Sequence, residues 1–335
     1  MPSADATLID AVERHLGRRP QEVRVHSETS NFFAIERGDA ITLGGLIYLV
    51  TGTMREVGFG LDDEPKYWVK RAVDLKTGLS KIIKLVFLEQ FSISVGDTDV
   101  RCFRSPAKEA RVLQRVYRHP QFMKGFGIRD TVGNEVRVID FIPGANLVRY
   151  ITDRPASHEA FFQEQAPALL WRLLPCLQGL RYLHDSGERH GDIRPDHIIV
   201  DSETGLFRWI DFDYDFAHPE APFSLDILGV GNIIAMIVAR GAIDARRLET
   251  EPALAGVRDR LTPDDLSVAD RGCLMNLRKA YPYIPEALNR VLMHFANGAE
   301  LFYEDIGEVI EDLGAAVSGL TTGDALESEY AVTTR

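Results

Sequence analysis

The sequence predicts an α+β protein made of two lobes, a strand-rich lobe followed by a helical one. Between residues 41 and 143, short runs rich in β-branched and aromatic residues alternate with turn residues, as strands and hairpins do. After residue 145, apolar residues recur at helical spacing, most clearly in the leucine stripe from 169 to 183. A chain of 335 residues is long enough for two such lobes, and ligands favour the cleft that two lobes create.

The composition and the charge exclude several classes of protein. Apolar residues make up 45% of the chain and charged residues 26%, values that exclude a disordered chain, a coiled coil and a collagen-like repeat. A formal net charge of −12 argues against broad binding to nucleic acid, which needs a basic surface. The 3 cysteines are too few for a disulfide framework or a four-ligand zinc site. We find neither a signal peptide nor an apolar run long enough to span a bilayer, and we therefore expect a cytoplasmic protein.

The strand-rich lobe is expected to carry one extra hairpin and one main helix. Before the lobe, residues 6–17 of an N-terminal extension have apolar side chains at helical spacing. The extra hairpin is expected at 91–103, and Ser105 followed by a proline predicts the start of the helix. The predicted strands cover residues 47–50, 67–73, 81–87, 123–129 and 135–142.

The helical lobe is expected to follow a Pro-Gly turn that closes the strand-rich lobe. Helical patterns cover the leucine stripe, residues 225–239 and residues 285–314. Because Pro167 and Pro175 lie in or near the leucine stripe, we expect that helix to start late or to be kinked. The predicted domains are an N-terminal extension (1–40), the strand-rich lobe (41–143), the helical lobe (144–318) and a flexible tail (319–335).

Two acidic residues carry the chemistry that the sequence indicates. Asp192 lies in a His-Gly-Asp-Ile-Arg-Pro-Asp-His run and Asp211 in an Ile-Asp-Phe-Asp run, each beside a β-rich stretch. Phosphoryl transfer needs two such acids, because one carboxylate orients the attacking hydroxyl and accepts its proton while the other holds Mg²⁺ against the nucleotide phosphates. Hard divalent cations prefer oxygen ligands of this kind. The pair therefore favours phosphoryl-transfer chemistry.

From about residue 45 to 314, the order of the motifs resembles that of the protein kinase superfamily. The resemblance implies a bilobal protein-kinase-like fold and ATP as the phosphoryl donor. It implies that Asp192 orients the substrate hydroxyl, that Asp211 binds the metal, and that Lys84 and Glu109 position the nucleotide phosphates. The remaining correspondences are Gly58 and Gly60 in the phosphate-covering loop, Asp140 and Ile142 in the hinge that meets the adenine, and Asp226 with His190 as structural supports of the catalytic loop.

Three residues near the acidic pair depart from the family's pattern. His197 stands where the catalytic loop normally ends in asparagine, a second metal ligand; metal binding, for which imidazole suits Mn²⁺ better than Mg²⁺, and a hydrogen bond within the loop are both open. Asp213 replaces the usual glycine and either gives a second oxygen ligand beside Asp211 or points outward from a turn. Arg194 replaces a lysine and keeps a positive charge near the transferred phosphoryl group.

Other departures bear on nucleotide binding and on regulation. The loop after Gly58 and Gly60 continues into acidic residues at 62–64, whose carboxylates would repel phosphates and predict weak nucleotide affinity. Gly191 replaces the arginine that normally reads an activation-loop phosphate, so we expect no such control. The stretch 212–225 is shorter than the usual activation segment with its substrate platform.

We therefore expect an ATP-dependent protein kinase that uses Mg²⁺ or Mn²⁺ and transfers the γ-phosphoryl group to a serine or threonine hydroxyl of a protein substrate. Two alternatives stay open. A pseudokinase would bind a nucleotide or a partner protein without catalysis, and would use the 6–17 helix and the 91–103 hairpin as docking surfaces. A small-molecule phosphotransferase of the aminoglycoside or choline kinase type would suit the short stretch after Asp213.

Overall fold

The computed structural model describes residues 4–55, 64–95, 98–153, 157–216, 221–270 and 272–320. Contacts within the chain divide it into two compact units. The first unit contains residues 1–90 and 103–142, and it is dominated by a β-sheet. The second contains residues 91–102 and 143–335, and it is mostly helical. This confirms the predicted α+β class.

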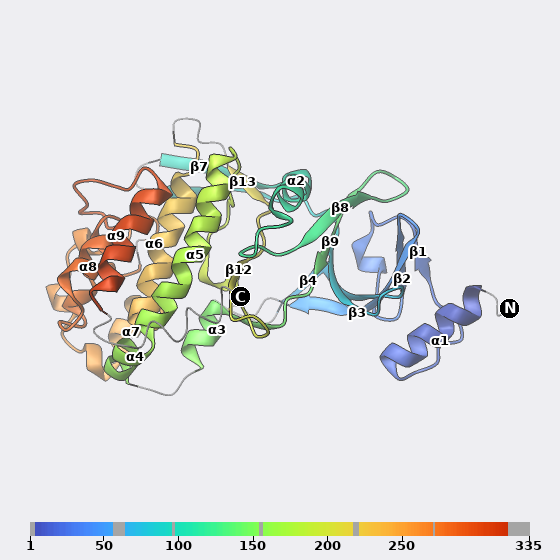
Figure 1. Ribbon diagram of the computed structural model, residues 1–335, viewed down its shortest axis with the longest axis horizontal. Helices are drawn as coiled ribbons and strands as arrows, with labels where there is room; N and C mark the ends of the chain where they lie inside the picture. Colours follow the sequence, from blue (N-terminus) through green and yellow to red (C-terminus); the bar gives the residue numbers. More distant parts are fainter. Residues whose placement is uncertain are drawn as a thin grey trace. The chain divides into compact units, whose positions relative to one another are not determined.

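A seven-stranded sheet forms the first unit, in the order β1-β2-β3-β4-β5-β9-β8 (Figure 1). Only the β1–β2 pair is parallel among the registers of this sheet in the described chain. Buried apolar side chains such as Tyr48, Ile83 and Val138 form its core. The strands are β1 (Val25–His26), β2 (Ala40–Leu43), β3 (Leu46–Arg55), β4 (Pro65–Asp74), β5 (Ser80–Lys84), β8 (Gly125–Arg129) and β9 (Glu135–Asp140).

Helix α2 (Pro106–Val116) packs on β8 and β9 and begins where the sequence predicts. The hydroxyl of Ser105 accepts a hydrogen bond from the backbone N–H of Lys108 at 3.2 Å, so the side chain satisfies a donor that the first turn leaves without a partner. Leu113 and Val116 are fully buried against the sheet. The cap and this apolar face fix the place of every other residue on the helix.

The N-terminal extension belongs to the first unit by its contacts. It holds helix α1 (Ala4–Leu16), β1 and the short 3-10 helix η1 (Phe32–Ala34). Thr29 donates to Asp130 through both its backbone N–H (2.8 Å) and its hydroxyl (2.9 Å), and Asp130 lies in the turn between β8 and β9. The extension is therefore joined to the sheet by buried hydrogen bonds.

Long helices dominate the second unit, where α5, α6 and α9 lie side by side (Figure 1). The apolar stretch expected as a buried central helix is α6, whose residues from Ile233 to Ala239 are all buried. The helices are α3 (Leu147–Thr152), α4 (His158–Glu164), α5 (Ala166–Asp185), α6 (Ser224–Ala239), α7 (Ala245–Thr250), α8 (Glu286–Met293) and α9 (Ile306–Ser318).

Two sequence predictions about these helices need correction. Helix α5 does not start late, because Pro167 lies in its first turn, where proline needs no hydrogen-bond partner. The helix continues through Pro175, and a kink at that residue stays a prediction. The pattern at 285–314 is two helices with a break after Met293. Asp305 caps the second of them and forms a capping box with Glu308, which starts a new helix inside a continuous apolar pattern.

Two small sheets complete the second unit. One contains β10 (Gly144–Asn146), β11 (Ile198–Asp201) and β12 (Phe207–Trp209), all antiparallel. The other has the order β13-β7-β6 and joins β13 (Tyr214–Phe216) to the predicted hairpin, whose strands are β6 (Gln90–Val95) and β7 (Thr98–Arg104). No helix in the described part of the chain has the length and apolar character needed to cross a membrane.

Candidate active site

In the first unit, Lys84 and Glu109 form a buried ion pair. Lys84 ends β5 and its Nζ lies 2.8 Å from Oε1 of Glu109, which lies in the first turn of α2. The second carboxylate oxygen, Oε2, accepts a hydrogen bond from Nε of Arg137 on β9 at 3.0 Å. All three side chains are almost fully buried. The structure thus brings the two predicted residues together and adds an arginine that the sequence analysis did not single out.

The other residues predicted to meet the nucleotide are less fully described. Asp140 ends β9, and its carboxylate pairs with Lys81 of β5 at 2.5 Å. Ile142 follows two residues later and is partly buried. Gly58 and Gly60, with most of the acidic run after them, lie outside the described residues. The hinge and phosphate-loop roles of these residues stay predictions.

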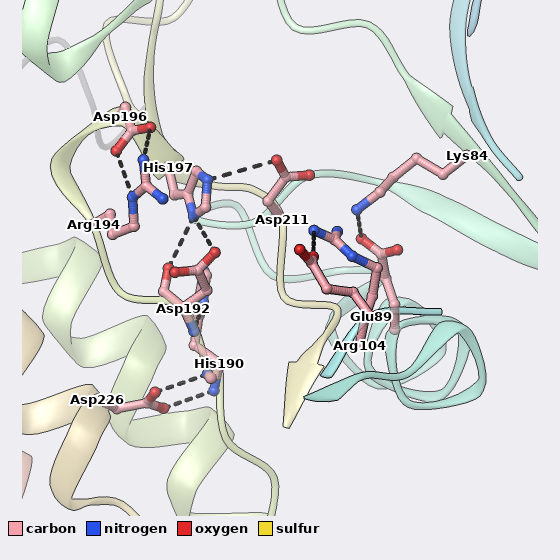
Figure 2. A network of polar contacts seen from close by, with 12 residues as sticks. Lys84, Glu89, Arg104, His190, Asp192, Arg194, Asp196, His197, Asp211 and Asp226 are labelled. Atoms are coloured by element: carbon pink, nitrogen blue, oxygen red, sulfur yellow. Dashed lines mark hydrogen bonds and ion pairs between the residues drawn. The ribbon is translucent and has the colours of Figure 1, made fainter. Parts of the chain in front are cut away.

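In the second unit, Asp226 of α6 holds the loop that carries Asp192. Its carboxylate accepts hydrogen bonds from the backbone N–H groups of His190 (2.7 Å) and Gly191 (2.8 Å) (Figure 2). It also pairs with Nε2 of His184 at 2.9 Å. Burial alone would raise the pKa of Asp226, but His184 and the Gly191 amide lower it to about 2. The carboxylate therefore stays charged and keeps the loop in place.

Close packing with α6 fixes the next part of the loop. A Cβ atom added to Gly229 of α6 would lie 2.6 Å from the carbonyl oxygen of Ile193. Only glycine permits this distance, because any other side chain would push the loop away from the helix. The residue on each side of Ile193 is a predicted catalytic residue, so the helix surface determines where these two residues lie.

The ring of His197 contacts both predicted acids (Figure 2). Its Nδ1 lies 2.9 Å from the backbone oxygen of Asp192 and 3.4 Å from the Oδ2 atom of the same residue. Its Nε2 lies 3.7 Å from Oδ2 of Asp211. His197 makes the hydrogen bond within the loop that one of the two open interpretations expects, and it also joins the two carboxylates.

Burial and charge shift the pKa values of this group. Burial raises the pKa of Asp192, although His197 and Arg194 act in the opposite direction. Burial opposes protonation of His197, but the carboxylates of Asp192 and Asp211 outweigh it and raise the pKa of the imidazole. A raised carboxyl pKa suits a group that accepts a proton, and the raised imidazole pKa favours the protonated ring between the two acids.

Arg194 forms an ion pair with Asp196. Its Nε donates to Oδ1 of Asp196 at 3.1 Å and its Nη2 donates to Oδ2 at 2.8 Å, a two-bond geometry that fixes the guanidinium plane (Figure 2). The arginine side chain is 37% exposed while Asp196 is 14% exposed. The pair holds a cation two residues from Asp192 in a defined orientation.

A divalent cation would find oxygen donors here, but not a complete protein cage. Asp211 has a left-handed backbone (φ 60°) and a side chain that is 30% exposed. Asp213 is 1% exposed, so it does not point outward from a turn. In the described residues no three His, Cys, Asp or Glu side chains are grouped as a metal site, so the predicted set of Asp211, Asp213 and His197 is not gathered around one point. Magnesium bound to nucleotide phosphates needs only one or two carboxylates, and Asp211 fits that smaller role.

Three residues with partners in these regions escaped the sequence analysis: Arg137 in the first unit, and Asp196 and Arg189 in the second, where Arg189 pairs with Asp215. Arg137 alternates with valines in a strand, which by itself indicates a solvent-facing side chain. Asp196 follows Arg194 by two residues, and this short spacing was a signal for the pair. Arg189 lies two residues before Gly191, the position where the family's arginine is missing. A search for a nearby replacement arginine would have found it.

The β-rich first unit and the helical second unit, with the paired lysine and the loop held by Asp226, are consistent with a bilobal kinase-like fold. No family model matches the chain. Several protein kinases match it at low identity. These matches support membership of the protein kinase superfamily, and their low identities of 23–27% are consistent with divergence.

Three relatives illustrate the extent of the similarity. Serine/threonine-protein kinase RAD53 of Saccharomyces cerevisiae is 23% identical over 174 residues, which are 52% of this chain and 19% of that protein. Sperm motility kinase 2B of Mus musculus is 23% identical over 220 residues, 58% of this chain and 43% of that protein. Calcium/calmodulin-dependent protein kinase type I of Schizosaccharomyces pombe is 26% identical over 111 residues, 33% of this chain and 31% of that protein. Each match spans less than half of the relative's length.

Proposed function

We propose that the chain is an ATP-dependent protein kinase that transfers the γ-phosphoryl group to serine or threonine hydroxyls of a protein. The observation that carries the proposal is the position of Asp192 and Asp211 on either side of one imidazole, on a loop held by Asp226. A proton acceptor and a metal-binding carboxylate that contact the same imidazole suit phosphoryl transfer. Relatives named as serine/threonine-protein kinases support the choice of acceptor.

The residues take separate roles in this proposal. Asp192, with its raised pKa, orients the hydroxyl and accepts its proton. Arg194, held by Asp196, stabilises charge on the transferred group. Lys84, held by Glu109, positions the phosphates of ATP. Mg²⁺ or Mn²⁺ would supply positive charge to those phosphates, and Asp211 would hold it.

A pseudokinase is the second candidate, and the position of His197 favours it. Nε2 of this imidazole lies 3.7 Å from Oδ2 of Asp211, and the raised pKa favours a proton there, where a divalent cation would compete with it. A chain of this kind would bind ATP weakly with or without metal. It would act through a partner protein instead of through catalysis.

Phosphotransfer from labelled ATP tests the proposal and separates the candidates. The wild type and Asp192→Asn are compared with Mg²⁺ or Mn²⁺, using protein acceptors in one series and small alcohols in another. We expect labelled protein with the wild type and a rate about 100-fold or more lower with Asp192→Asn, since general-base catalysis contributes on this scale. Equal labelling by both proteins would contradict the proposal. Labelling of alcohols alone would favour a small-molecule phosphotransferase.

Nucleotide binding measured by calorimetry tests the metal-binding role. We expect added Mg²⁺ to strengthen ATP binding by the wild type and to have no effect on Asp211→Asn, because the substitution removes the carboxylate that would hold the cation. Binding that is equally metal-dependent in both proteins would show that Asp211 does not hold the metal. Metal-independent binding in the wild type would favour the pseudokinase.

A further inference from the structure

The segment that follows Asp211 is part of a sheet whose other strands come from a distant part of the sequence. Strand β13 (Tyr214–Phe216) lies at one edge of the sheet β13-β7-β6. Strands β7 and β6 are the hairpin inserted between β5 and α2. The strand that would belong to an activation segment in a kinase is therefore paired with the inserted hairpin of this chain.

Apolar packing supports the pairing. Val100 and Cys102 of the hairpin and Phe216 of β13 are buried in one cluster, at 2%, 4% and 2% exposure, and Leu225 at the start of α6 packs against them. Phe91 of β6 meets Tyr214 of β13 edge to face, with ring centroids 5.4 Å apart. The hairpin thus contributes side-chain contacts as well as strand pairing to the segment after Asp211.

Arg189 contacts the same segment from the catalytic loop. Its Nε lies 3.1 Å from Oδ1 of Asp215, and its Nη1 donates to the backbone oxygens of Phe216 (2.8 Å) and Pro222 (3.3 Å). Its guanidinium carbon lies 4.5 Å from the centre of the Phe216 ring. One side chain therefore binds a carboxylate, two carbonyl groups and a ring, all within residues 215–222.

The backbone next to Arg189 is also held in place. The next two residues, His190 and Gly191, donate their backbone N–H groups to Asp226. The arginine and its partner Asp215 are 24% and 23% exposed, so their ion pair is partly shielded from water. In a kinase whose activation segment is phosphorylated, new arginine contacts to the phosphate order the segment. Here the chain itself supplies the partner of the arginine, the carboxylate of Asp215.

We propose that Arg189 and the β6–β7 hairpin form a permanent clamp that orders the segment after Asp211, so that Arg189 is a positioning residue for Asp211 and no phosphate on the segment is needed. The ordering depends only on the contacts described above. Its use in catalysis rests on the proposed kinase function. The clamp differs from mere retention of the fold because it acts on residues 212–216, and among the residues of α6 the packing includes only Leu225 at its start, not the buried stretch from Ile233 to Ala239.

Amide hydrogen exchange of the full-length protein tests the clamp without reference to activity. Peptides covering residues 212–216 are followed in the wild type, Arg189→Gln, Arg189→Lys and Val100→Thr. We expect exchange about tenfold faster in Arg189→Gln and in Val100→Thr, because a charge-assisted contact or the apolar packing is lost. Arg189→Lys keeps the charge but lacks the planar guanidinium group that contacts Asp215 and the Phe216 carbonyl at the same time, and an intermediate exchange rate is expected.

Arg149→Gln is the matched control. This arginine lies in α3 of the same unit and is 62% exposed, and its Nε lies 3.6 Å from Oδ2 of the exposed Asp153. An exposed ion pair of this kind contributes little to stability, so its loss should leave the exchange of residues 212–216 unchanged. Exchange in α6 is followed in every variant and should also stay unchanged. Unchanged exchange at 212–216 in both Arg189→Gln and Val100→Thr would overturn the clamp, and so would equal acceleration in α6.

The catalytic role of the clamp is tested by phosphatase treatment and by metal titration of phosphotransfer. We expect phosphatase-treated wild type to keep its rate, and Arg189→Gln to need a several-fold higher Mg²⁺ concentration for half its maximal rate, with partial rescue by Arg189→Lys. Loss of activity after phosphatase treatment would contradict the proposal. A wild type that orders residues 212–216 as expected but transfers no phosphoryl group would overturn the kinase function and the catalytic role, and would leave the ordering by the clamp supported.

Discussion

Nε of Arg137 lies 3.0 Å from Oε2 of Glu109, on the opposite carboxylate oxygen from the one that Lys84 contacts. One buried carboxylate is thus shared by two buried cations. The three residues are therefore expected to contribute unequally to the stability of the fold. If either Lys84 or Arg137 is removed, the other cation still pairs with the carboxylate of Glu109. If the carboxylate is removed, two positive charges are left in the interior without their shared partner.

The stability of the first unit should therefore depend more on Glu109 than on Lys84. We expect Glu109→Gln to lower the free energy of unfolding by about 3–5 kcal/mol, the usual cost of breaking a buried pair. Lys84→Met should cost about 1 kcal/mol, because Arg137 still pairs with the carboxylate. Urea unfolding monitored by fluorescence measures both values. A larger loss for Lys84→Met would contradict the shared-carboxylate interpretation.

Replacing Gly229 even by alanine is expected to destabilise the protein. Because an added Cβ would lie 2.6 Å from the Ile193 carbonyl oxygen, Gly229→Ala should displace the loop and cost about 1–3 kcal/mol, the usual cost of overpacking. It should also lower phosphotransfer, since Asp192 moves with the loop. Gly314→Ala is the control: nothing lies within 4 Å of its added Cβ, and this helix substitution should stabilise the protein by up to about 1 kcal/mol. Equal effects of the two substitutions would refute the argument.

His158 should make the protein less stable in acid. Burial lowers the pKa of this imidazole to about 4, with help from the charge of Arg247, although the hydrogen bond that Nε2 donates to the Val238 carbonyl acts in the opposite direction. Its Nδ1 lies 2.6 Å from the Tyr283 hydroxyl, and the ring stacks on Tyr281. The folded state thus binds the proton more weakly than the unfolded state, whose histidine has a pKa of about 6.5. Its contribution to stability is complete above pH 6.5 and is lost as the pH falls towards 4.

The check on His158 is the urea midpoint at pH 7.5 and at pH 4.5 in the wild type and in His158→Gln. We expect the wild type to lose more stability between these two pH values than the variant does, because glutamine does not titrate. Tyr283→Phe removes a donor that opposes protonation of Nδ1 and should reduce the wild-type loss as well. Parallel losses in all three proteins would rule out His158 as the titrating group.

Arg194→Lys should lower phosphotransfer although it keeps the charge. The lysine cannot make both bonds to Asp196, so the cation loses its fixed orientation. We expect kcat to fall about tenfold, which corresponds to about 1.4 kcal/mol in the activation free energy. Arg208→Lys is the comparison, since Arg208 forms a similar 2.8 Å pair with Asp201 away from the predicted acids. A similar loss of kcat in both variants would remove the special role of Arg194.

Local patterns predicted much of the fold because the physics behind them is local. The strand at 81–87 and the cap at Ser105 were both visible in the sequence, and together they set the place of Lys84 and Glu109. The break between α8 and α9 was missed because the apolar spacing continues across it. The signal was the Asp305 capping box, which outweighs periodicity where the two disagree.

The site was harder to predict, since its contacts join residues that are distant in sequence. Nothing near Arg189 indicates that its partner is Asp215, and nothing near Glu109 indicates that Arg137 turns inward. The positive φ of Asp211 also has no local signature, because aspartate adopts this conformation more often than most residues other than glycine but still in only a few positions. Such features follow from tertiary packing and not from residue order.

The assignment of residues 91–102 to the second unit has a practical consequence for anyone who wishes to produce the units separately. A single cut after Ile142 would leave the hairpin attached to the wrong piece. Val100 and Cys102 would then lose Phe216 as their cover, and β7 would lose β13, keep only β6 as a neighbour and become an open edge. An uncovered apolar edge promotes aggregation. Insolubility of such a fragment would come from the hairpin, which lies within the sequence of the first unit but packs in the second, and not from an inability of the seven-stranded sheet to fold.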